Sequence, residues 1–313
     1  MSLYSNTIRT QEYTDKLLNF IKFEHGIDAV NINPAKRGFY GETWRVNEIN
    51  SSYFVKAVYS TAHKNIYEKS FPIIEHINNH GIDFISKIVR TKKGELFTQF
   101  DDAIIGVFDW IEGENKQDEQ SKIHEYQLLA KIYTVPTDGL EITREKFSSE
   151  SADTFFNKYE KLEADTPIKK LLEIHRSKIE HRANRLRFFS VRCCNSGTVP
   201  LFITHGDAGG NYITNGNKGY IVDWDTPILT SPERDAWFCM HWDWAMKVFH
   251  NALRENGLNY TLRPERLAYY CYHMFFYYLN AYIDRFILNG DTPGLDEYMN
   301  GWIEDSFKFA ERI

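Results

Sequence analysis

The chain has 313 residues, of which 42% are hydrophobic and 26% are charged, a balance typical of globular proteins that excludes wholesale disorder. Its formal net charge of -6 argues against a general binder of nucleic acid or anionic membranes, so neither is expected as a partner. Because no segment approaches the roughly 20 apolar residues that span a bilayer and residues 1–16 lack an apolar signal region, we expect a cytoplasmic protein.

The N-terminal residues predict a helix followed by strands. Apolar residues recur at helical spacing within 11–24. Two strand-like segments follow at 32–48 and 51–60, separated by a cluster of turn residues. The second segment alternates in the β manner around Lys56. These features indicate the first half of a small sheet.

A second helix and three more strands complete this part of the chain. Residues 62–80 have helical spacing, although Pro72 fits a helix only if it lies in the first turn. Further strands are predicted at 83–91, 95–100 and 103–113. We therefore expect a lobe built on an antiparallel sheet over 1–111.

The rest of the chain is mainly helical in pattern. Residues 112–121 are polar and charged and are the best candidate for a hinge linker. The predicted helices lie at 121–133, 151–163, 166–188, 234–255, 262–288 and 295–311. The expected fold class is α+β and bilobal, with a helical C-terminal lobe over 122–313.

One acidic hairpin, "THGDAGGNYITNGNKGYIVDWD" at 204–225, interrupts the helical pattern. Its "NGN" turn supplies the residues that tight hairpins need. Folding back at this turn brings Asp207 and Asp223 to the same open end, with Asn211 facing the same space. Phosphoryl transfer needs oxygen ligands for Mg²⁺ and a carboxylate beside the attacking hydroxyl. The hairpin therefore predicts a site that holds a metal ion and a phosphate.

These residues carry a family resemblance. His205-Gly206-Asp207 with Asn211, followed by "IVDWD" at 221–225, resembles the catalytic and metal loops of the aminoglycoside phosphotransferase and choline kinase superfamily. These enzymes are small-molecule relatives of protein kinases. The segment 224–238 is further similar to the spectinomycin phosphotransferase branch, in which an E-R-D-x-x-F segment follows the metal loop. The resemblance implies a protein-kinase-like fold.

The resemblance also implies roles for the hairpin residues. Asp207 would be the catalytic residue that orients or deprotonates the substrate hydroxyl, and His205 would brace the catalytic loop. Asn211 and Asp223 would hold Mg²⁺. Asp207 and Asn211 are four positions apart where the usual pattern has five, and Gly209-Gly210 would compensate through positive φ angles.

On the nucleotide side, Lys56 matches the strand lysine that contacts the α and β phosphates of ATP or GTP. Its expected partner is Glu68, with Glu75 as the alternative on the same helix face. The remaining implied nucleotide contacts are Gly38, Gly41 and Thr43 in the phosphate-covering turn, and Phe108, Asp109, Trp110 and Ile111 in the hinge that takes the base.

The substrate is less sharply indicated. From Asp225 to the end the chain carries 13 acidic and 8 basic residues, a net charge of -5, which suits a cationic small molecule. Candidate substrate residues are Asp225, Trp242 and Asp243. Asp225 could instead brace the metal loop, and the aromatic stretch 237–249 could instead pack into the core.

We therefore expect an enzyme that moves the γ-phosphoryl of ATP or GTP to a hydroxyl of an aminoglycoside or aminocyclitol antibiotic. A metabolic kinase of the choline, homoserine or methylthioribose type shares these motifs, and a catalytically silent scaffold of the same fold is the other alternative. A protein kinase is disfavoured because no A-P-E segment follows Asp223. The sequence leaves the acceptor and the oligomeric state open.

Overall fold

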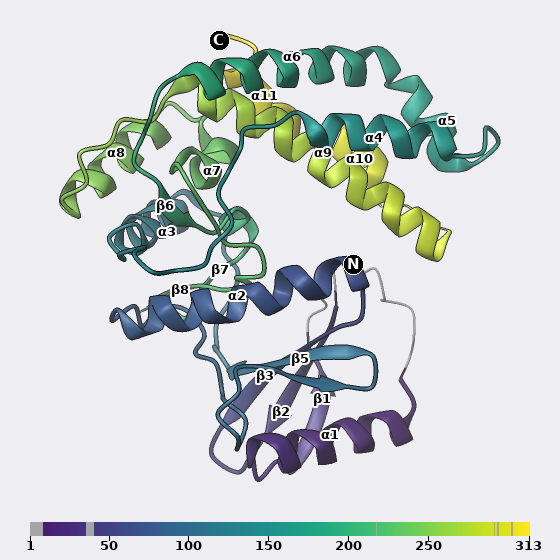
Figure 1. The fold of residues 1–313 in the computed structure, drawn as a ribbon, viewed down its shortest axis with the longest axis vertical. Coiled ribbons are helices and arrows are strands. Elements are labelled where there is room, and N and C mark those ends of the chain that lie inside the picture. Colours follow the sequence, from purple (N-terminus) through teal and green to yellow (C-terminus); the bar gives the residue numbers. More distant parts are fainter. Residues whose placement is uncertain (1–8, 36–40, 217, 291, 293, 302) are drawn as a thin grey trace. The chain divides into compact units, whose positions relative to one another are not determined.

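The computed structural model describes residues 9–35, 41–216, 218–290, 292, 294–301 and 303–313. Two compact units make up the chain (Figure 1). The sheet unit comprises Met1–Ile142 and His205–Pro227, and the helical unit comprises Thr143–Thr204 and Ile228–Ile313. The acidic hairpin thus groups with the N-terminal sheet. No helix in the described residues combines the length and apolarity needed to cross a bilayer.

The sheet unit is built on five antiparallel strands in the order β1-β2-β3-β5-β4. Neighbouring side chains on each strand point to opposite faces. In register, Lys56 of β3 lies opposite Thr43 of β2 and Gly106 of β5. The strands are β1 Asn31–Pro34, β2 Glu42–Asn47, β3 Ser52–Val58, β4 Thr98–Phe100 and β5 Ala103–Asp109.

One face of the sheet packs on α1 (Gln11–His25), which confirms the first predicted helix. The Thr10 side chain caps its N-terminus by accepting from the Tyr13 amide, and Gly26 ends it in a left-handed conformation. Leu17 and Ile21 of this helix are fully buried in the core of this face. The core also contains alternate strand residues, among them Trp44, Val46, Val55, Ala57, Ile105 and Val107.

The opposite face is covered by α2 (Thr61–Asn79), and Figure 1 shows α1 and α2 on the two sides of the sheet. Tyr67 and Phe71 of α2 pack so close to Gly106 that a Cβ there would overlap the Tyr67 hydroxyl and the Phe71 ring. The helix predicted at 62–80 is present, and it contains Pro72 in its interior and not in its first turn. An interior proline costs about 3 kcal/mol, which burial of the neighbouring helix face offsets.

The prediction of a strand at 83–91 is wrong. This segment makes only an isolated bridge between Ile88 and Phe108. Two backbone hydrogen bonds flank it, from Val89 to Val107 and from Asp109 to Lys87. The segment therefore runs beside the end of β5 without forming a regular ladder. The strand predicted at 95–100 is shorter than expected, because only Thr98–Phe100 pair with β5.

The predicted acidic hairpin is confirmed. Its strands β7 (Tyr212–Thr214) and β8 (Gly219–Ile221) pair antiparallel, so that Tyr212 lies opposite Ile221. The turn η1 (Ala208–Gly210) precedes β7. Helix α3 (Glu119–Ile132) begins within the expected linker, because the Asp118 side chain caps it by accepting from the Ser121 amide.

The helical unit surrounds α9 (Pro264–Asn289), whose fully buried side chains include Tyr269, Tyr270, Tyr272 and Phe275. Its other helices are α4 Glu150–Lys161, α5 Pro167–Ile174, α6 Arg176–Asn195, α7 Glu233–Ala236, η2 Trp237–Cys239, α8 Ala245–Glu255, α10 Leu295–Asn300 and α11 Ile303–Ala310. The predicted helices at 166–188, 234–255 and 295–311 are therefore each interrupted. A strand pair, β6 Phe202–Thr204 with β9 Ile228–Thr230, was not predicted because three residues are too few to show a period.

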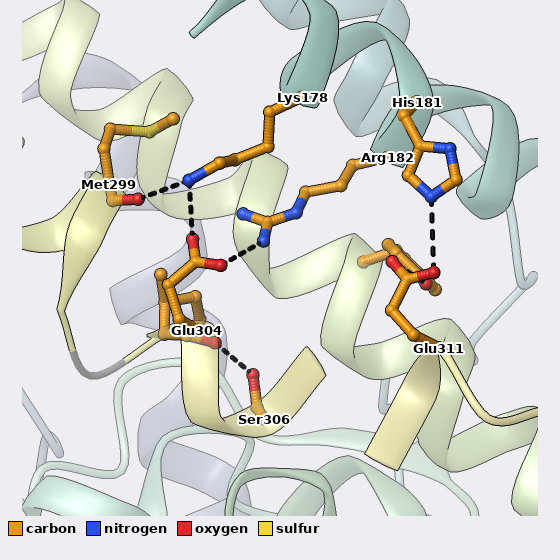
Figure 2. A network of polar contacts seen from close by, with 9 residues as sticks. Lys178, His181, Arg182, Met299, Glu304, Ser306 and Glu311 are labelled. Carbon is orange, nitrogen blue, oxygen red and sulfur yellow. Dashed lines mark hydrogen bonds and ion pairs between the residues drawn. The ribbon is translucent and has the colours of Figure 1, made fainter. Parts of the chain in front are cut away.

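A polar network joins α6 to α11 in the helical unit (Figure 2). The Glu304 carboxylate accepts from Lys178 Nζ at 3.2 Å and from Arg182 Nη2 at 2.8 Å. The Arg182 guanidinium also lies 3.6 Å from the Phe307 ring centroid, and its side chain is only 5% exposed. The network thus anchors the C-terminal helix through a nearly buried cation.

Replacing Glu304 with glutamine is expected to lower the free energy of unfolding by about 1–3 kcal/mol, because the Arg182 cation stays buried without its carboxylate. Urea denaturation of the variant and the parent chain measures the difference. Equal midpoints would show that the network contributes nothing to stability.

Candidate active site

A cavity of about 520 Å³ lies within the sheet unit. This volume is in the range of about 300–1,000 Å³ that small-molecule sites occupy. Ten of the residues predicted from the sequence line it: Thr43, Lys56, Phe108, Asp109, Trp110, Ile111, Asp207, Asn211, Asp223 and Asp225. The structure therefore brings strand, hinge and hairpin residues to one concave site.

The other described residues among those predicted do not line the cavity. Gly41 does not line the cavity, but a Cβ there would come within 2.6 Å of the Ala57 carbonyl oxygen, so β2 can start beside β3 only at a glycine. Gly38 lies outside the described residues. Trp242 and Asp243 belong to the helical unit, where Trp242 stacks on Trp244 at 5.3 Å.

The ammonium of Lys56 is the centre of the site. The residue is 3% exposed, and Nζ lies 2.6 Å from Asp223 Oδ1 and also pairs with Asp225. Burial alone would lower the pKa of Lys56, but attraction by the two carboxylates outweighs it and raises the pKa above its ordinary value. Lys56 therefore stays charged at any physiological pH.

The expected pair between Lys56 and Glu68 is not formed among the described residues. Helix α2 turns the ring of Tyr67 toward Lys56, with Nζ 5.7 Å from the ring centroid. Glu68 is the next residue and points about 100° away around the helix. The hairpin aspartates supply the negative charge instead. The sequence did not predict that Tyr67 faces Lys56, because helical periodicity does not determine which face of α2 meets the sheet.

The pKa values of the two aspartates shift in opposite directions. Burial would raise the pKa of Asp223, but attraction to Lys56 outweighs it and lowers the pKa. Burial and repulsion by Asp223 raise the pKa of Asp225 to about 7. Near pH 7, Asp223 is therefore ionised and Asp225 is about half protonated, so that with the Lys56 cation the three groups carry a net charge between 0 and -1.

This pKa predicts a pH-dependent stability. A carboxyl group whose pKa is raised in the folded state makes its full contribution to stability at pH values below the ordinary pKa of 3.8. This contribution is lost as the pH rises through the folded-state pKa of about 7. The stability of the parent chain relative to Asp225→Asn should therefore fall by about 1–3 kcal/mol between pH 5 and 8. Urea denaturation across this range tests it, and a constant difference would contradict the raised pKa.

His205 fixes the start of the catalytic loop. It is buried, its Nε2 donates to the Val222 carbonyl at 2.8 Å, and its Nδ1 accepts from the Asp207 amide at 3.1 Å. The Trp224 indole packs edge-on against the imidazole at 4.6 Å. His205 thus contacts the backbone through both ring nitrogens, and Asp207 is exposed at the cavity.

The short loop reaches Asn211 differently from the way we predicted. Gly209 and Gly210 have no positive φ; they form the turn η1, in which the Asn211 amide donates to Ala208 O at 3.0 Å. The left-handed residues at the site are Gly206, with φ of 89°, and Asp223, with φ of 64°. A left-handed aspartate is uncommon, and such strain concentrates at functional sites.

The oxygen donors of the hairpin suit a hard divalent cation. Asn211 and Asp223 both line the cavity. The Val222 amide donates to Asn211 O at 2.9 Å, which joins the backbone segments just before β7 and just after β8. Within the described ranges, no group of three or more His, Cys, Asp or Glu side chains forms a closed metal cage. Mg²⁺ needs no such cage, because it keeps waters and phosphate oxygens as ligands.

The hinge segment has one amide left for a ligand. The amides of Asp109 and Trp110 donate to the carbonyls of Lys87 and Ser52 at 2.9 and 3.2 Å. Ile111 is the next residue, and its amide has no hydrogen-bond partner in the part of the chain that the structure describes. All four residues of the expected hinge line the cavity, together with the apolar Phe54.

A second missed residue is Lys122 of α3, whose Nζ donates to the Gly209 carbonyl at 2.6 Å. A signal was present: Lys122 and Glu125 share the helix face of Tyr126 and Leu129, which are buried apolar residues. A lysine and a glutamate within an apolar stripe indicate a buried pair.

No protein-family model matches the chain, and no curated protein sequence matches it. Solved structures do match its fold. The spectinomycin phosphotransferase APH(9)-Ia, in complex with ADP and spectinomycin, aligns with a TM-score of 0.73 and 19% identity over 96% of this chain and 98% of its own. Choline kinase LicA from Streptococcus pneumoniae aligns with a TM-score of 0.66 and 14% identity, over 97% and 100% of the two chains.

An amicoumacin kinase, hAmiN, in complex with AMP-PNP and Ca²⁺, aligns with a TM-score of 0.63 and 11% identity over 97% of this chain and 96% of its own. These alignments span nearly the whole of each chain. The fold expected from the sequence is thus confirmed: the chain has the α+β, kinase-like fold of these phosphotransferase and choline kinase structures.

Proposed function

We propose that the chain transfers the γ-phosphoryl group of a nucleoside triphosphate to a hydroxyl of a small molecule. The observation that carries this proposal is the meeting of Lys56 with Asp223 and Asp225 in a cavity that Asp207 and Asn211 also line. A purely structural site has little physical need for a buried lysine and three aspartates at one cavity.

In this proposal, Lys56 binds the α and β phosphates of ATP or GTP, and the hinge amide of Ile111 binds the base. Asn211 and Asp223 would hold Mg²⁺, which neutralises phosphate charge when bound. Asp207 accepts the proton of the substrate hydroxyl or orients it toward the γ-phosphorus. Asp225 pairs with Lys56, which favours a role at the phosphate side of the site over direct contact with the acceptor.

For the acceptor, we favour an aminoglycoside or aminocyclitol antibiotic. The likeness to a phosphotransferase solved with spectinomycin supports this choice. The net charge of -5 from Asp225 to the end suits a cationic compound. The assignment of Trp242 and Asp243 as substrate residues rests on the sequence alone.

A metabolic kinase that acts on a cationic alcohol is the second candidate. Its support is the choline kinase likeness, which covers 97% of this chain. A catalytically silent scaffold has weaker support, because the short catalytic loop still presents Asp207 and Asn211 at the cavity.

A panel of acceptors assayed with Mg²⁺ and either ATP or GTP tests the proposal through nucleoside diphosphate release. The panel contains aminoglycosides, spectinomycin, choline, homoserine and methylthioribose. Expression in a susceptible host adds an independent readout, because a resistance enzyme raises drug tolerance and a metabolic kinase does not. Absence of both transfer and slow hydrolysis of the nucleotide would favour the scaffold.

A further inference from the structure

The catalytic loop has a hydrogen-bond donor for the backbone carbonyl of every residue from 207 to 211. Within the loop and hairpin, Asp207 O accepts from Asn211 Nδ2 at 2.6 Å and Ala208 O accepts from Asn211 N at 3.0 Å. Asn211 O accepts from the Val222 amide at 2.9 Å. Among the described residues, the carbonyls of Gly209 and Gly210 accept hydrogen bonds only from side chains of another segment.

Those donors come from the start of α3 and the segment before it. Lys122 Nζ donates to Gly209 O at 2.6 Å, and Asn115 Nδ2 donates to Gly210 O. Lys122 is 1% exposed, and its ammonium also pairs with the Glu125 carboxylate, likewise 1% exposed, at 2.7 Å. The loop thus rests on a buried ion pair that lies outside the lining of the cavity.

The burial of the Lys122–Glu125 ion pair is energetically unfavourable unless the charges serve a purpose. Desolvating an ion pair costs several kcal/mol per ion, and apolar residues of similar volume are often at least as stabilising. A pair spaced i to i+3 on a helix could equally lie on the surface. A buried ammonium does supply what an apolar residue cannot, which is a charged donor to a carbonyl in a loop that glycines leave conformationally free.

We propose that Lys122, neutralised by Glu125, is a positioning residue that locks the shortened 207–211 loop so that Asp207 and Asn211 present their side chains to the cavity. The inference rests on the proposed phosphotransfer for its catalytic consequence. Its structural part, that the pair immobilises the loop, stands on the contacts alone.

The test uses the double variant Lys122→Met/Glu125→Leu, which removes both charges together and leaves neither ion buried alone. Hydrogen exchange of the peptide that covers 206–214 is measured in the absence of nucleotide. Amides of the loop, Asn211 above all, should exchange at least about 10-fold faster than in the parent chain because the Gly209 carbonyl loses its donor. With an accepted substrate, kcat should fall about 10–100-fold while the Kd for nucleotide changes less than about threefold.

The matched control removes another ion pair from the same chain. Arg182→Met/Glu304→Gln removes the Arg182–Glu304 ion pair from the network of Figure 2, whose drawn contacts do not include the loop. This control should leave loop exchange and kcat at the parent values even if it lowers stability. A general loss of stability would accelerate exchange in both variants alike, so the comparison isolates the loop.

Parent-like loop exchange in a folded Lys122→Met/Glu125→Leu variant would overturn the proposal and reduce the pair to a packing feature. If that variant does not fold, Lys122→Gln keeps a polar neighbour for Glu125 and is judged by the same exchange measurement. Failure of the proposed function would appear as no transfer by the parent chain to any acceptor, whereas the exchange result decides the role of Lys122 independently.

Discussion

The variant Asp207→Asn is expected to lose about 10²–10⁴-fold in kcat while it binds nucleotide as the parent chain does. The carboxylate lies exposed at the cavity, and its backbone is held by His205 through a 3.1 Å hydrogen bond from the Asp207 amide. Asparagine keeps the size and the backbone contacts but cannot accept a proton. The loss should therefore fall on the chemical step and leave the fold intact.

Steady-state release of nucleoside diphosphate gives kcat, and calorimetric titration with ADP and Mg²⁺ gives the Kd. Asp138→Asn provides the matched control, because Asp138 is an exposed aspartate of the same unit that does not line the cavity. Undiminished turnover by Asp207→Asn against a true substrate would remove Asp207 from the mechanism. Loss of ADP binding as well would point to a structural role in place of a catalytic one.

Lys56→Met is expected to reduce kcat/KM by about 10²–10³-fold and to weaken nucleotide binding, because the phosphates lose their buried cation. The same change leaves the carboxylates of Asp223 and Asp225 together without a counter-ion. Breaking a buried pair in this way destabilises proteins by about 3–5 kcal/mol, and partial exposure of Asp223 should keep the loss near the lower end.

The loss of stability should also depend on pH. Without Lys56, the raised pKa of Asp225 rises further, so a proton can replace the lysine in acid solution but not in alkaline solution. Urea denaturation at pH 5 and pH 8 should thus show the larger loss at pH 8. Lys93→Met, at an exposed lysine of the same unit, is the matched control. A Lys56→Met variant with parent-like ADP affinity would separate Lys56 from the nucleotide site.

The sequence by itself determined the elements that local chemistry specifies. The "NGN" turn and the alternating residues on each side specify the hairpin that carries Asp207 and Asp223. The period of two places Lys56 on one face of β3, and the period of 3.6 predicts α1 and α2 close to their observed bounds. These features depend on neighbours within a few residues, which is the range that a sequence pattern reports.

Only the tertiary structure decided which charges meet. Periodicity gives a helix a buried face but not its rotation against the sheet, so it could not show that Tyr67, and not Glu68, faces Lys56. The donation of Lys122 to the Gly209 carbonyl joins segments 87 residues apart. Such contacts form because a buried charge must find an opposite charge or a dipole wherever packing brings one within reach, and that choice depends on the whole fold.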